Sequence, residues 1–162
     1  DVDPNTQGTE VVSQFWLLLT IGCILGLALL KIMDAKQVLK LFSIGAACSL
    51  MFAIFGTKEI ALIAFPASGF FLSIMWSVIF SLGLNSVAKG HSAVSGILCT
   101  GIVGGALASP IIGFLAELSG DLRFSLLVLL IPLGFIFSVS VWAKPLIKNH
   151  TIQLVKKRTV MD

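Results

Sequence analysis

Polar side chains recur at every fourth position in one long apolar stretch of the sequence, PASGFFLSIMWSVIFSLGLNSVA. Steps of four from Gly69 reach Ser73, Ser77, Ser81 and Asn85, which would lie one above another on a helix. This stripe carries hydroxyl and amide groups but no charge. It is therefore suited to hydrogen-bonding a neutral polar molecule.

Two aromatic side chains, Trp76 and Phe80, flank the stripe. An indole face can stack on a pyranose ring while nearby hydroxyls hydrogen-bond to it, so these residues predict a neutral sugar as ligand. An alternative carries equal weight: the serine hydroxyls can bond to carbonyls of their own helix, and Trp76 can simply pack. Pro66 and Gly83 can bend the backbone of this helix.

Residues that usually carry catalysis or bind metals are scarce. Cys23, Cys48 and Cys99 all fall in apolar runs, and no CxxC or Cys/His spacing is present. His91 and His150 are expected to be solvated. Because the sequence also lacks a Ser–His–Asp set, a phosphate-binding loop and a nucleotide fingerprint, we expect no enzyme activity, no metal, no cofactor and no nucleic-acid partner.

The elements that must position the polar stripe are membrane helices. The 162 residues are 57% hydrophobic and 12% charged, whereas about 25% of residues are charged in a soluble domain. Charged residues are absent from the runs Val11–Leu30, Leu41–Thr57, Ile60–Ala88, Gly90–Ala116 and Phe124–Ala143. About 20 apolar residues cross a bilayer once, and barrel strands would alternate in polarity. We predict an all-α integral membrane bundle over residues 1–143, with five helices at about 11–30, 41–57, 60–88, 92–116 and 124–143.

Basic residues are divided unequally between the two sides of such a bundle. Lys58 and Arg123 lie on one side, and the other nine of the 11 lie on the opposite side. The positive-inside rule places those nine in the cytoplasm, together with a basic tail at 144–162. The N-terminus then lies outside although no signal peptide precedes it, so we expect the chain to be a fragment of a longer polytopic protein.

Small residues mark the faces on which membrane helices can approach closely. Gly22 and Gly26 are four residues apart in the first run, and the fourth run carries a denser set of Ser95, Gly96, Gly101, Gly104, Gly105, Ala108, Ser109 and Gly113. We expect the first and fourth helices to face protein, although a static bundle can use such glycines too. The fifth helix is mostly large and apolar and is expected to face lipid. Gly120 followed by Asp121 predicts a helix stop and then an N-cap.

The strings SIMWSVIFSLGLNSV and SGILCTGIVGGALASPIIGFLAELSGDLR resemble the C-terminal half of the fucose–galactose–glucose:proton symporter family of the major facilitator superfamily. The resemblance covers about residues 11–149 and implies that the five helices correspond to helices eight to twelve of a twelve-helix transporter. The segment IGCILG resembles the family's IGRFIG pattern, with Cys23 where an arginine is usual. By this resemblance the third helix lines a central cavity, and the first and fourth pack between the two halves.

Together these observations predict the C-terminal half of a proton-coupled hexose transporter of the glucose, galactose or fucose type. It would work by alternating access in a bacterial inner membrane, with its C-terminus in the cytoplasm. The residues expected to contact the sugar are Ser73, Trp76, Ser77, Phe80, Ser81 and Asn85. By the resemblance, the carboxylates that couple proton movement lie in the missing N-terminal half, and the five runs contain no Asp or Glu that could serve as a relay. The alternative is a membrane scaffold or subunit whose helices only pack.

Overall fold

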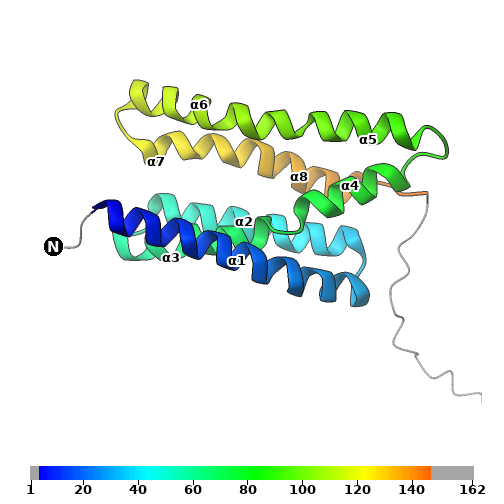
Figure 1. Cartoon of the computed structure of the whole chain (residues 1–162), viewed down its shortest axis with the longest axis horizontal. Coiled ribbons are helices and arrows are strands. Elements are labelled where there is room, and N and C mark those ends of the chain that lie inside the picture. Colours follow the sequence, from blue (N-terminus) through cyan, green and yellow to red (C-terminus); the bar gives the residue numbers. More distant parts are fainter. Residues whose placement is uncertain (1–3, 147–162) are drawn as a thin grey trace, which may run out of the picture.

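The computed structural model describes residues 4–146 as helices that run along a common axis (Figure 1). The elements are α1 (Pro4–Ile32), α2 (Ala35–Phe55), α3 (Lys58–Leu72), α4 (Met75–Asn85), α5 (His91–Thr100), α6 (Ile102–Ser119), α7 (Leu122–Ser125), the 3₁₀ helix η1 (Leu126–Leu129) and α8 (Leu130–Trp142). Within the described range, five stretches are long and apolar enough to cross a membrane: Thr6–Ile32, Ala35–Phe55, Lys58–Asn85, His91–Ser119 and Leu122–Trp142. The predicted fold class, an all-α membrane bundle with five spans, is confirmed.

The helices extend beyond the charge-free runs at several ends. α1 begins at Pro4 and continues past Lys31, so it is longer than the stretch 11–30 predicted for it. Charges are tolerated at helix ends because their side chains can reach the polar edge of the bilayer. The predicted tail is described only as far as Leu146, and His150 and the basic residues from Lys148 onward lie outside the described residues.

α2 is the central helix of the packed part of the chain. It contacts α3 on one side and α8 on another, and its side chains Val38, Leu39 and Phe42 are almost completely buried. Ile74, which directly precedes α4, and Met75, its first residue, belong to the same apolar core. Close packing must hold these helices together, because lipid offers apolar side chains the same environment as a neighbouring helix.

The span formed by α5 and α6 lies at the outer edge of the molecule in Figure 1, beside α7. Among the described residues, none of its side chains is buried. A Cβ at Gly96, Gly104, Gly105 or Gly113 would meet nothing within 4 Å, so these four glycines of the face predicted to meet protein have no close neighbour in the described part of the chain. Sequence patterns identify a face that can pack closely, but they do not identify the helix that packs on it.

The fifth span differs from the prediction that it faces lipid. α8 packs along α2 and buries Leu133 and Ser140, whereas Ile131 and Phe135 on its other face are exposed. The prediction was wrong for the buried face. Large apolar side chains suit both a lipid-facing surface and a helix-packing surface, so composition alone could not separate them.

The turn between α6 and α7 has the predicted geometry. Gly120 adopts φ 69°, in the left-handed region that favours glycine, and its N–H donates to the carbonyl of Ala116. Asp121 then accepts a hydrogen bond from the Arg123 N–H on Oδ1 at 2.8 Å. The helix stop and the N-cap predicted here are confirmed.

Candidate functional site

The third span is two helices, with a break at Ser73–Ile74 between α3 and α4. Helix α3 continues through Pro66, and α4 continues through Gly83. A bend at Pro66 or Gly83 stays a prediction, because both residues lie inside continuous helices and the interruption is elsewhere. The break divides the polar stripe: Gly69 lies in α3, Ser73 lies in the break itself, and Ser77, Ser81 and Asn85 lie in α4.

Side chains of the span itself and of α1 satisfy polar groups at the break. The Ser73 hydroxyl donates to the Phe70 carbonyl at 2.7 Å, and the Cys23 thiol of α1 donates to the Ser73 carbonyl at 3.5 Å. A broken membrane helix requires such partners, because the hydrocarbon region supplies no water for the freed backbone groups. Cys23 is thus a direct neighbour of the break, a contact that the sequence did not predict.

Close contact with α1 holds the break in place. A Cβ at Gly22 would lie 2.5 Å from the Phe70 carbonyl oxygen, and one at Gly69 would lie 2.7 Å from the Phe15 carbonyl oxygen. A Cβ at Gly26 would meet the side chain of Ile74. These glycines allow α1 to approach α3 at the level where the third span is interrupted.

The corresponding glycines of the fourth span have no such neighbours in the described part of the chain. A Cβ at Gly104 or Gly105 would meet nothing within 4 Å, and one at Gly101 would meet only the carbonyl group of Leu98 in the preceding helix. Ser109 is exposed. The packing role expected for these four residues stays a prediction.

Helix α4 carries Trp76, Ser77 and Phe80 on the face opposite to the residues that pack into the core. Met75, Val78 and Leu82 are buried and attach α4 to the core. Trp76 is 42% exposed, and its ring centroid lies 6.1 Å from that of Phe80, with the planes tilted by 44°. The two rings therefore form a pair that offers an aromatic surface away from the core.

The polar members of the stripe occupy three different environments. Ser77 is exposed beside Trp76, whereas Ser73 is turned toward its own helix and α1. Ser81 accepts a hydrogen bond from the Asn85 side-chain amide at 3.4 Å, and both residues are half-buried. The structure thus pairs the exposed Trp76 with the half-buried Phe80, next to the exposed Ser77 on the same helix, and it separates Ser73 from them.

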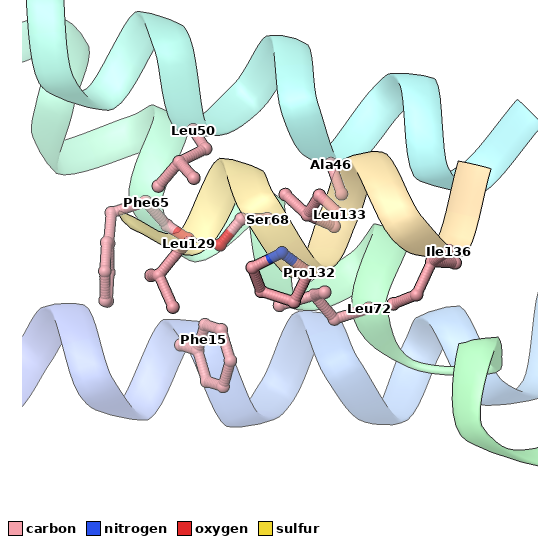
Figure 2. Close-up of a pocket in the computed structure, with 10 residues that line it drawn as sticks. All are labelled: Phe15, Ala46, Leu50, Phe65, Ser68, Leu72, Leu129, Pro132, Leu133 and Ile136. Carbon is pink, nitrogen blue, oxygen red and sulfur yellow. Dashed lines mark hydrogen bonds between the residues drawn. The ribbon is translucent and has the colours of Figure 1, made fainter. Parts of the chain in front are cut away.

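A cavity of about 320 Å³ lies between α1, α2, α3 and the fifth span (Figure 2). Its lining is Phe15, Ala46, Leu50, Phe65, Ser68, Leu72, Leu129, Pro132, Leu133 and Ile136. The only side-chain hydroxyl among these residues, that of Ser68, donates to the Phe65 carbonyl at 2.6 Å. The cavity is apolar and offers little for hydrogen-bonding a sugar, so the exposed face of α4 remains the candidate site.

Comparison with known proteins gives two informative relatives. The chain is 35% identical over 116 residues to a glucose/galactose transporter of Brucella abortus, which covers 72% of this chain and 28% of that protein. It is 26% identical over 102 residues to the L-fucose-proton symporter of Escherichia coli, which covers 63% of this chain and 23% of the symporter. The chain is a partial homologue of the fucose–galactose–glucose:proton symporter family of the major facilitator superfamily.

This homology confirms the family resemblance and the multi-pass membrane character predicted from the sequence. The relatives are named as transporters and not as enzymes. The chain spans about a quarter of the length of these curated relatives. No family model matches the sequence, and no solved structure matches it.

Proposed function

We propose that this chain is the C-terminal half of a proton-coupled hexose transporter and that the exposed face of α4 contacts the sugar. The observation that carries the proposal is the grouping of Trp76, Ser77 and Phe80 away from the core of a chain homologous to sugar transporters. The ring pair supplies a stacking surface, and the Ser77 hydroxyl can donate to or accept from a sugar hydroxyl. Ser81 and Asn85 extend the polar edge of the same helix.

The five spans correspond, in this proposal, to helices eight to twelve of a twelve-helix transporter in a bacterial inner membrane. Alternating access requires two halves that rock against each other around a central site. Gly96, Gly104, Gly105 and Gly113, whose small surfaces meet no described neighbour within 4 Å, are where contact with the rest of the transporter is expected. Carboxylates that take up and release the coupling proton belong to that other part.

The interruption at Ser73–Ile74 supports a transport role because it allows α4 to tilt relative to α3. α3 is held by α1 and α2, whereas α4 contacts α2 and α5. A change of backbone angle at the break would move Trp76 and would also shift Ile74 and the Ser73 carbonyl, which contact α1 at Gly26 and Cys23. Discontinuous helices near the middle of the bilayer are a recurrent feature of substrate sites in transporters.

Sugar accumulation by the complete transporter in proteoliposomes tests this proposal. An imposed proton gradient should drive uptake of radiolabelled glucose, galactose or fucose, and a protonophore should abolish it. Folded, correctly inserted protein that accumulates none of the three sugars above the level of protein-free vesicles would favour the alternative of a membrane scaffold.

A further inference from the structure

A second pocket lies at the end of the bundle where α2 begins and α8 ends. It has a volume of about 320 Å³ and is lined by Asp34, Lys36, Gln37, Lys40, Ser140 and Val141. Two lysines against one aspartate give the lining a net positive charge. The pocket is separate from the exposed face of α4 and from the apolar cavity in Figure 2.

The structure fixes one of the two cations at the pocket wall. The Lys36 ammonium group donates to the Val141 carbonyl at 3.1 Å, across the contact between α2 and α8. An ammonium group has three donors, so two remain for a ligand. Lys40 is exposed one turn further along α2, and the exposed Gln37 amide lies between the two lysines in the sequence.

The other two polar side chains of the lining, Asp34 and Ser140, give an anion no donor, and the Asp34 carboxylate opposes an anion by its own negative charge. Asp34 precedes α2, and its carboxylate forms no hydrogen bond to the first turn of that helix. Ser140 is buried, and its hydroxyl donates to the Phe137 carbonyl at 2.6 Å. Recognition of an anion in this pocket therefore depends on Lys36, Gln37 and Lys40.

The surface below the pocket indicates what kind of anion fits. α2 continues from Lys40 as an exposed apolar stripe that includes Leu41, Ile44, Met51, Phe52 and Phe55. Trp142, 62% exposed at the end of α8, is of the type that marks the boundary between lipid and water. A ligand with a phosphate group above hydrocarbon chains would satisfy the lysines and the stripe together.

The geometry points to a binding site for the headgroup of an anionic phospholipid at this end of α2 and α8. The phosphate would lie between the Lys36 and Lys40 ammonium groups, with the acyl chains along the exposed stripe of α2. Basic pockets between membrane helices bind anionic headgroups in this manner. The site depends on insertion in a bilayer and is independent of sugar transport.

Native mass spectrometry of the complete transporter, purified in detergent with added phosphatidylglycerol or phosphatidylcholine, tests this inference. The protein should retain phosphatidylglycerol in preference to phosphatidylcholine, and Lys36→Gln/Lys40→Gln should weaken that retention by about tenfold or more. Lys31→Gln/Lys144→Gln is the matched control, because it removes the same charge from exposed residues outside the pocket. Equal loss in both pairs would show a diffuse charge effect and would overturn the site.

Two further measurements separate lipid binding from folding and from binding of a free anion. Lys40→Gln alone keeps the Lys36 bond to Val141 and should still weaken retention, whereas Lys36→Arg/Lys40→Arg should preserve it. Inorganic phosphate at millimolar concentration should leave the bound lipid in place. Displacement by phosphate, or full retention of lipid by Lys40→Gln, would contradict the proposal.

Discussion

Trp76 is the residue on which the proposed sugar contact depends most. Its neighbours Met75 and Val78 are buried in the core, so the helix holds the indole on the opposite face beside Phe80. The sequence predicted this pair and Ser77 correctly as neighbours, because all three lie within five residues of one helix. It could not predict the separation of Ser73, because the break depends on contacts with α1 that are distant in the sequence.

Replacement of Trp76 by Leu should weaken sugar binding to the complete transporter by about 1 kcal/mol, and replacement by Phe should weaken it less. Phe retains a flat ring for stacking, whereas Leu does not. Isothermal titration calorimetry on folded protein measures the difference. Unchanged affinity in Trp76→Leu, with a loss only of stability, would show that the indole packs and does not bind sugar.

At the scale of elements, the sequence predicts which helix faces can approach another helix closely better than it predicts which helix packs on each face. Hydropathy located all five spans, because the bilayer requires a nearly fixed length of apolar chain. The four-residue spacing of Gly22 and Gly26 coincides with the face of α1 that touches the third span. A Cβ at Gly104 or Gly105 of α6 would instead meet open space in the described chain, and α8 packs on α2 through a face that buries Leu133 and Ser140.

Gly22→Val should destabilise the chain by about 2 kcal/mol, because its side chain would overlap the Phe70 backbone, which cannot rotate away. Gly104→Val is the matched control, since a side chain there meets open space. Thermal denaturation of the purified chain, followed by circular dichroism, compares the two. Equal melting temperatures for both variants would contradict the packing of α1 on α3.

Two basic side chains join α2 to the fifth span at opposite ends. The Arg123 guanidinium donates to the Gly56 carbonyl at 3.1 Å, just beyond α2, and Lys36 donates to Val141 near the end of α8. Each places a positive charge at the negative end of the partner helix. The pairing is reciprocal because the two helices run in opposite directions.

Arg123→Gln should lower the free energy of unfolding by about 1 kcal/mol, since a charged hydrogen bond is lost at an exposed position. Lys58→Gln, which removes an equal charge from the residue two positions after Gly56, is the control and should cost less. Denaturant titration of the purified chain measures both. A larger loss in Lys58→Gln would show that the Arg123 bond contributes little.

At the scale of the whole molecule, one span of the chain is packed much less completely than the others. α5 and α6 expose every side chain to some extent in the described range, and the relatives are about four times as long as the matched segment. The open face is the expected location of contact with the rest of the transporter. Lys36 lies at the end of α2 opposite to Gly56 and Arg123, and we expect the end with Lys36 to face the cytoplasm.

Single cysteines in a cysteine-free version of the complete transporter test this orientation. Residues introduced at Lys36 and Lys89 should react with a membrane-impermeant maleimide only after the cells are opened, because the positive-inside rule places them in the cytoplasm. A cysteine at Asp121 should react in intact cells. Labelling of a cysteine at Lys36 in intact cells would contradict this topology and would indicate the opposite orientation.

Protection of a single cysteine at Ser77 tests the central claim most directly. Ser77 is exposed beside Trp76 on α4, so Ser77→Cys in the complete, cysteine-free transporter should react with a hydrophilic thiol reagent that enters an aqueous cavity. Glucose, galactose or fucose, whichever is transported, should slow this reaction, whereas a sugar that is not transported should leave its rate unchanged. A Ser77 cysteine that never reacts with the hydrophilic reagent, or reacts at the same rate with every sugar, would place this face of α4 outside the sugar pathway.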